Sequence, residues 1–154
     1  LTFIISVIIY LQYYKEIENR KNIEIGKILF TLSSNNNPLG NVLNSYNYGG
    51  FLIFNGYNPY IDSRMEVYGD QFIKNFFGSI DFTRGSTSLD KLIKNHNIQW
   101  TIFETSQVIN TYMQTKTDWL KLYSSSNVTI YTNNNININK STIVNLSKIK
   151  NQYK

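Results

Sequence analysis

The sequence predicts an α/β protein: a three-layer sandwich with a mainly parallel sheet and a C-terminal antiparallel hairpin, preceded by the end of a transmembrane helix. Three observations lead to this prediction. Helical and strand-like segments alternate along the chain, which is typical of a parallel sheet covered by helices. Two β-rich runs flank the turn residues 124–127, which predicts the hairpin. The first 14 residues carry no charged side chain.

The apolar run at residues 1–14 predicts the last part of a membrane-crossing helix. The run is shorter than the roughly 20 residues that a complete span needs. It also lacks the basic n-region and the small-residue cleavage site of a signal peptide. The alternative is a buried core helix of a soluble protein, but apolar residues occur on every face of the run, without a polar stripe. We therefore expect this chain to be a fragment of a longer membrane protein.

Residues 15–38 predict a charged connector and a short amphipathic helix. Lys and Glu alternate at its start, and four apolar residues then recur at helical spacing: Ile25, Ile28, Leu29 and Leu32. Pro38 and Gly40 are expected to end the helix, because proline cannot donate a helical hydrogen bond and glycine favours a turn.

Residues 39–132 form the predicted α/β domain. A short strand is expected at 41–45, and a helix at 51–54, where a strand is the competing interpretation. Tyr60 and Ile61 predict a brief buried strand. Ser63 and Glu66 have the spacing of a capping box, so the next helix should begin there and end near Gly78.

The second half of this domain has clearer signals. A helix should begin at 87–90 and close at 95–97, because asparagine tolerates the left-handed conformation. Residues 98–103 predict the clearest strand, 108–114 a short helix, and 119–132 the hairpin. Residues 133–154 are expected to be a polar Asn/Lys-rich tail, either frayed or marginally helical.

Composition excludes several kinds of site. The chain has no cysteine and one histidine, His96, so it cannot form a disulfide, a thiolate metal site or a multi-histidine zinc site. The net charge of +5 permits contact with an anionic surface. However, the lysines form no dense stripe interleaved with aromatic rings, so no nucleic-acid partner is expected. No metal, cofactor or catalytic residue is predicted within this chain.

Polar side chains follow three of the predicted strands. Asn47 follows the first, Asp62 and Arg64 the second, and Glu104 the third. Because the carboxyl ends of parallel strands meet at one sheet edge, these groups should lie in one region. One interpretation is a site for a sugar, phosphate or lipid-linked headgroup, with Arg64 holding an anion. The other is structural: Asp62 caps a helix and pairs with Arg64, which orients the loop.

Aromatic residues are dense between positions 46 and 60. Such rings stack on sugars in carbohydrate sites, but they also serve in cores and bilayer contacts. Gly49 and Gly50 separate two of them and lack the spacing of a dinucleotide-binding fingerprint. We expect this glycine pair to allow a positive backbone dihedral angle or close packing against a ring.

Two motifs together carry a family resemblance. Residues 48–54 read aromatic-Gly-Gly-Phe-Leu-Ile-Phe, and residues 59–64 read Pro-Tyr-Ile-Asp-Ser-Arg, followed by a tyrosine. This pattern resembles the C-terminal region of bacterial and archaeal glycosyltransferases of the GT-C type, akin to the dolichyl-phosphate-mannose mannosyltransferases. The family segment often has Glu-Trp where this chain has Asn47 and Tyr48, and a glycine at Ser63. The matching residues are Tyr48, Gly49, Gly50, Asp62, Arg64 and Tyr68.

The resemblance implies an accessory, extracytoplasmic domain of a membrane glycosyltransferase that uses a lipid-phosphate-linked sugar donor. The catalytic loops of such an enzyme lie outside this chain, so the chain alone is not expected to be catalytic. The implied partners are membrane lipid, the enzyme's own upstream transmembrane domain, and a lipid-linked sugar or acceptor. The alternative from another class is a non-catalytic, membrane-anchored binding or scaffold domain.

Overall fold

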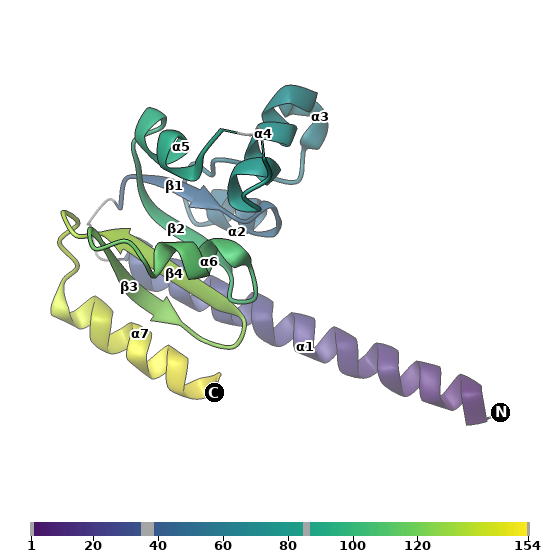
Figure 1. The fold of residues 1–154 in the computed structure, drawn as a ribbon. Coiled ribbons are helices and arrows are strands. Elements are labelled where there is room, and N and C mark those ends of the chain that lie inside the picture. Colours follow the sequence, from purple (N-terminus) through teal and green to yellow (C-terminus); the bar gives the residue numbers. More distant parts are fainter. Residues whose placement is uncertain (1, 35–38, 85–86, 154) are drawn as a thin grey trace.

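A computed structural model of the protein describes residues 2–34, 39–84 and 87–153. Figure 1 shows a sheet with helices packed on both faces, so the predicted α/β class and its layering are confirmed. The sheet contains β1 (Asn41–Asn44), β2 (Ile98–Glu104), β3 (Trp119–Ser124) and β4 (Val128–Asn133), in the order β1-β2-β4-β3. The predicted strand at 98–103 and the terminal hairpin are both present.

The prediction of a mainly parallel sheet is wrong. β1 and β2 are parallel, but β2 pairs antiparallel with β4, and β4 pairs antiparallel with β3. The hairpin thus contributes two of the four strands, and the strand predicted at Tyr60 and Ile61 does not form. Pro59 precedes this pair and has no N–H to donate, and the segment is held by a side chain of β1 instead of a backbone ladder.

The first face of the sheet is covered by α1 (Thr2–Ser33), α2 (Gly49–Phe54) and α7 (Lys140–Gln152). The amphipathic stripe predicted in the connector is confirmed: Ile25, Ile28, Leu29 and Leu32 of α1 are buried against β2 and β4. The fully buried Trp100 of β2 lies in this layer and donates its indole N–H to the carbonyl of Gly40 at 3.2 Å. This face holds the larger hydrophobic core cluster.

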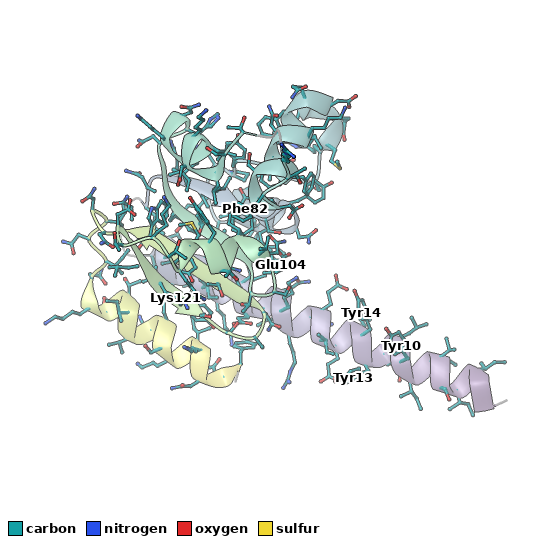
Figure 2. The ribbon with its side chains drawn as sticks, in the orientation of Figure 1. Tyr10, Tyr13, Tyr14, Phe82, Glu104 and Lys121 are labelled. Atoms are coloured by element: carbon teal, nitrogen blue, oxygen red, sulfur yellow. The ribbon has the colours of Figure 1, made fainter. Side chains whose placement is uncertain are left out.

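α1 continues without a break from the sheet into a projecting segment. Figures 1 and 2 show its first turns extending away from the remainder of the protein, with Tyr10, Tyr13 and Tyr14 on this part. Apolar and tyrosine side chains from Ile4 to Ile17 are 41–65% exposed. Within residues 2–34, 39–84 and 87–153, no helix combines the length and the apolar character that crossing a bilayer requires.

The second face is covered by α4 (Asp70–Ile80), α5 (Leu89–Asn95) and α6 (Val108–Met113). α5 begins within the predicted range 87–90, and Ser88 caps it by accepting the backbone N–H of Lys91. Asn97 has a φ of 47°, which confirms the left-handed end expected after that helix. Gly85 and Ser86, which we expected in the preceding loop, lie outside the described residues.

The capping box at Ser63 is not formed. α3 (Met65–Tyr68) begins after Arg64, without a capping hydrogen bond from a side chain. The predicted single helix is also interrupted at Gly69, whose φ of 76° and ψ of 155° no other residue adopts readily, and it resumes as α4. Ser63 instead offers its carbonyl to the hydroxyl of Tyr46, at 2.9 Å.

The Asn-rich C-terminal region contains a packed helix. Asn139 caps α7 by accepting the backbone N–H of Thr142 at 2.8 Å. Leu146 and Ile149 are buried in the core cluster that α1 also lines. The helical alternative for the tail is therefore present, and α7 derives its stability from packing along α1 and β3.

Candidate functional site

The candidate site surrounds the short 3₁₀ helix η1 (Tyr46–Tyr48), which connects β1 to α2. β1 and β2 are parallel, so their carboxyl ends meet here, as predicted. Three further segments lie around η1: the middle of α1, the loop at 60–64, and the residues that follow β2. The site is built from parts that lie far apart in the sequence.

Glu104, at the end of β2, is the centre of one polar network. Its Oε1 accepts the side-chain amide of Asn47 at 3.0 Å and lies 3.5 Å from the Lys21 ammonium. Its Oε2 accepts the side-chain amide of Gln107 at 2.7 Å. The carboxylate thus joins α1, η1 and the turn before α6, and it balances the lysine charge.

Tyr48 lies between this network and the core. The ring is buried, and the Lys21 ammonium lies 5.3 Å from its centre, within the range of a cation–π contact. Among the described residues its hydroxyl has no hydrogen-bond partner. Burial raises the pKa of Tyr48 well above its ordinary value, and the charges of Glu104 and Glu24 raise it further. Its hydroxyl is therefore neutral over the physiological pH range.

Glu24 is a second carboxylate on α1, and it is completely buried. Its two oxygens accept the hydroxyl of Tyr123 and the side-chain amide of Asn127, each at 2.7 Å. Burial, followed by this hydrogen bond, raises the pKa of Tyr123 well above its ordinary value. Glu24 ties α1 to the β3–β4 hairpin at the level of the candidate site.

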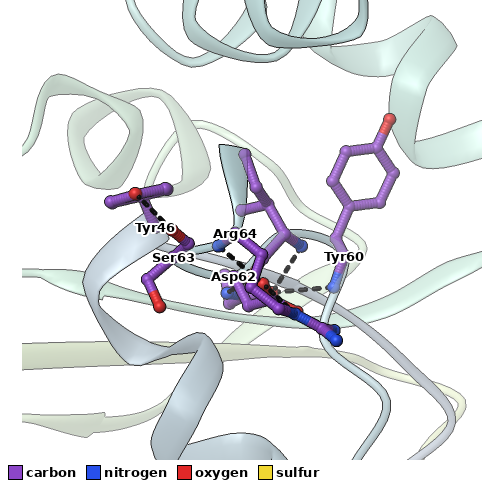
Figure 3. Close-up of polar contacts among 7 residues, drawn as sticks. Tyr46, Tyr60, Asp62, Ser63 and Arg64 are labelled. Carbon is purple, nitrogen blue, oxygen red and sulfur yellow. Dashed lines mark hydrogen bonds and ion pairs between the residues drawn. The ribbon is translucent and has the colours of Figure 1, made fainter. Parts of the chain in front are cut away.

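Asp62 and Arg64 form the other polar pair, shown in Figure 3. Asp62 is 3% exposed and accepts the Arg64 backbone N–H at 2.9 Å, its Nε at 3.0 Å and its Nη2 at 2.7 Å. The guanidinium hydrogen bonds hold the pKa of Asp62 well below its ordinary value, against the opposing effect of burial. The Tyr68 hydroxyl also lowers the pKa of Asp62, and the Tyr68 ring stacks on Phe72, with 5.0 Å between ring centres.

The Arg64 side chain is fixed at one edge and open at the other. It is 62% exposed, and two of its five N–H donors are used by Asp62. The carboxylate accepts three hydrogen bonds from Arg64, whereas the guanidinium keeps donors for an external anion. The predicted pairing of Asp62 with Arg64 is confirmed, but the predicted helix cap is wrong, because no side chain caps α3. Anion binding by Arg64 stays a prediction.

The glycine pair has two different roles. A Cβ built on Gly49 would lie 2.5 Å from the Cα of Asp62, so only glycine allows α2 to begin against this loop. Gly50 is exposed, and a Cβ there would meet nothing within 4 Å. The close packing expected of the pair is thus carried by Gly49, with backbone instead of a ring as the neighbour.

Asn44 is a buried residue that the sequence analysis did not select. Its amide donates to the carbonyl of Ile61 at 2.8 Å, and its Oδ1 accepts the backbone N–H of Tyr60 at 2.8 Å. One side chain therefore takes the place of a strand partner and holds Asp62 at the sheet edge. A polar residue at the end of a short apolar strand was the available signal.

Lys21, Glu24 and Gln107 were also missed. Glu24 was hidden in the charged connector, although it lies one helical turn before Ile28, within the apolar stripe. Lys21 lies on the same helix, and only the packing of α1 beside η1 brings it to Glu104. Gln107 lies three residues after Glu104, so its contact is local.

Two hollows flank η1. The larger has a volume of about 570 Å³ and lies between α1 and η1–α2. It combines aromatic rings with amides, a lysine and a carboxylate; its lining is Tyr14, Ile17, Glu18, Lys21, Asn22, Asn47, Tyr48 and Phe51. The smaller, of about 410 Å³, adjoins Gly50 and the 90% exposed Phe54. Arg64 lines neither hollow.

The structure thus brings the eight predicted site residues into two neighbouring groups. Asn47, Tyr48 and Glu104 adjoin the larger hollow, and Gly49, Asp62, Arg64 and Tyr68 form the second group. Gly50 lies at the smaller hollow. Within the described part of the chain, no group of three or more acidic or histidine side chains is placed to hold a metal ion.

Comparison with known proteins adds no relative. No family model matches the chain, and neither a curated protein nor a solved structure is significantly similar to it.

Proposed function

We propose that this chain is a membrane-anchored accessory domain whose larger hollow binds the polar headgroup of a lipid-phosphate-linked sugar. In this proposal the projecting half of α1 lies in the bilayer and the sandwich lies outside the cytoplasm. The domain would serve a membrane glycosyltransferase of the GT-C type, as the motif resemblance suggests. The proposal concerns contact with donor or acceptor, since the catalytic loops are expected elsewhere.

The observation that carries the proposal is the position of the hollow along α1. The apolar segment ends with three tyrosines, side chains that collect at the boundary between acyl chains and headgroups. The hollow begins at Tyr14 and continues past Lys21, that is, over roughly 10 Å of helix. If the tyrosines lie at that boundary, the hollow opens at the depth of the headgroups.

The lining of the hollow suits a sugar phosphate. Tyr14 and Phe51 offer ring surfaces, Asn22 and Asn47 offer amide hydrogen bonds, and Lys21 brings a positive charge. Lys21 is 28% exposed even though it is paired with Glu104, so its ammonium can still donate to a second oxygen. Glu104 is only 13% exposed and lies behind the lysine. The negative charge that lines the hollow is that of Glu18, so a phosphate must be held on the Lys21 side.

The motif residues support the same region. Gly49 and Asp62 are in contact, and Asp62 holds Arg64, so the two halves of the motif form one structural unit at the start of α2. This unit sets the position of η1, which supplies Asn47 and Tyr48 to the hollow. A motif whose parts pack together supports the resemblance better than scattered identities would.

The test measures binding of the chain to phosphatidylcholine vesicles with and without dolichyl-phosphate-mannose. We expect tighter binding when the glycolipid is present. Lys21→Gln should remove about tenfold of this preference, because hydrogen bonds to charged groups contribute about 1.5 kcal/mol or more. The matched control is Lys94→Gln, an exposed lysine on α5. Equal preference in the two variants would refute the site.

A scaffold domain is the second candidate, and the exposure of Phe54 favours it. Phe54 is 90% exposed and adjoins the smaller hollow, where a partner's side chain could be seated. In the same experiment, binding to pure phosphatidylcholine vesicles without any preference for the glycolipid would support this candidate.

A further inference from the structure

The net positive charge of this protein is confined to its C-terminal part. The chain has 15 basic and 10 acidic residues, and all ten acidic residues precede Trp119. Residues 1–118 contain ten basic and ten acidic residues, so they are neutral overall. Residues 119–154 contain five lysines and no acidic residue, which accounts for the whole charge of +5. This region comprises β3, β4 and α7.

The lysines of α7 are exposed and accompanied by apolar side chains. Lys140, Lys148 and Lys150 lie on the solvent side of the helix, while Leu146 and Ile149 face the core. Ile143 and Val144 are exposed between them, about half accessible each. Among the described residues, the ion pairs involve Lys21, Arg64 and Lys116, so the α7 lysines are not neutralised by carboxylates.

α7 also ends close to the projecting part of α1. It runs antiparallel to α1, as Figure 1 shows, and its last residues, Gln152 and Tyr153, line a hollow together with Ile17 and Arg20. Arg20 is six residues beyond Tyr14, or about 9 Å along the helix. Lys150 and Lys148 precede Gln152 by two and four residues, which places them about 12 and 15 Å from the tyrosine level along the helices. The Debye length at physiological salt is about 8–10 Å, so screening weakens their attraction to charge at that level without abolishing it.

We propose that α7 forms a second membrane contact, in which Lys148 and Lys150 face the anionic phospholipids around the α1 anchor. The orientation of α7 toward the bilayer rests on the proposed function, in which α1 is the anchor. The concentration of positive charge in residues 119–154 is independent of that proposal. Exposed lysines interspersed with isoleucine and valine are the composition of helices that lie at a charged bilayer surface. α1 would supply the apolar attachment, and α7 would select for anionic lipid and limit the tilt of the domain.

The test compares two double variants of the full chain: Lys148→Gln with Lys150→Gln, and, as a control, Lys91→Gln with Lys94→Gln on α5. Each removes two exposed positive charges, from opposite faces of the sheet. Binding is measured to phosphatidylcholine vesicles and to vesicles with about one-fifth phosphatidylglycerol. A lysine near an anionic surface contributes roughly a fivefold gain in binding, so the α7 variant should lose about tenfold or more on anionic vesicles only.

The control variant should keep the anionic preference, and added salt should weaken that preference in the unaltered chain. Equal losses in the two variants would overturn the inference. Competition by single-stranded RNA would also overturn it, if RNA displaces the unaltered chain from anionic vesicles and if RNA binding needs the same two lysines of α7. Lysine-dependent binding to anionic vesicles without any binding to neutral ones would support α7 and refute the α1 anchor. Unfolding of both variants in urea is measured alongside, so that a lost helix is recognised as such.

Discussion

The two halves of α1 have the same backbone but different surroundings. From Ile4 to Ile17, apolar side chains occur on every side of the helix and remain about half exposed. From Glu24 to Leu32, four of the five apolar side chains form one stripe buried against the sheet, and only Phe30, 68% exposed, lies outside it. Lys21 and Glu24 mark the change, because both are bound to groups of the sandwich.

This difference shows how hydrophobicity acts in one continuous helix. In the inner half, about 1.5–3 kcal/mol per buried side chain stabilises the fold. In the outer half, the same residue types make no such contribution in water, and their transfer into lipid would release a comparable amount. The inner half should therefore control folding, and the outer half attachment.

The largest expected effect is on folding. Ile28→Ala removes a fully buried side chain of the inner half and should lower the free energy of unfolding by about 2–5 kcal/mol. Ile8→Ala in the exposed outer half should change it by less than about 0.5 kcal/mol. Urea titration followed by the fluorescence of Trp100 and Trp119 measures both. Similar losses in the two variants would mean that the outer half also packs on the domain.

An intermediate effect is expected at the carboxylates of the two halves. Glu24→Gln replaces a charged acceptor by an amide N–H₂ that faces the Asn127 amide donor unless Asn127 turns its side chain over. It also weakens the bond from Tyr123, because the acceptor is no longer charged. The loss should be about 1–3 kcal/mol in the free energy of unfolding. Glu18→Gln, at an exposed position, should leave that free energy unchanged. An unchanged free energy of unfolding in Glu24→Gln would contradict this prediction, because the buried carboxylate would then stabilise the fold no more than an amide does.

The smallest effect is a loss of stability at high pH. Burial raises the pKa of Tyr57 to about 12, and it raises the pKa of Tyr48 and Tyr123 further. A raised folded-state pKa contributes stability that is complete below the unfolded value near 10 and declines as pH rises above it. Near pH 10, each of these tyrosines should lower the free energy of unfolding by a few tenths of a kcal/mol.

Urea titrations between about pH 8 and pH 11 measure this decline. Tyr123→Phe removes a hydroxyl that contacts the inner half of α1, so it should make the decline shallower even though it lowers stability at neutral pH. A decline of the same steepness in this variant would contradict the assignment.

Local signals were sufficient for some elements. The inner stripe of α1, the strand at 98–103, the start of a helix at 87–90 and the hairpin were all predicted, because spacing and turn residues act over a few positions. The failures have two kinds of cause. Tyr60 and Ile61 have the composition of a strand, but the distant side chain of Asn44 holds them. Gly69 ends a helix locally, where the apolar spacing alone predicts that it continues.

The candidate site divides in the same way. Tyr48, Gly49, Asp62 and Arg64 could be selected because they stand close together in a motif. Lys21 and Glu24 could not, because their partners, Glu104 and Tyr123, lie far away in the sequence. These two residues become visible only when helix and sheet are packed. Gln107 was missed for another reason: its contact with Glu104, three residues away, belongs to no motif.

The sequence by itself determined which faces of the elements are apolar and that all net charge lies after Asp118. Tertiary structure alone decided the strand order, the mixed direction of the sheet and the meeting of α1 with η1. It also decided which half of α1 is covered. The physical reason is that periodicity sets which face of an element is apolar, whereas the partner of that face depends on closing long loops around one core.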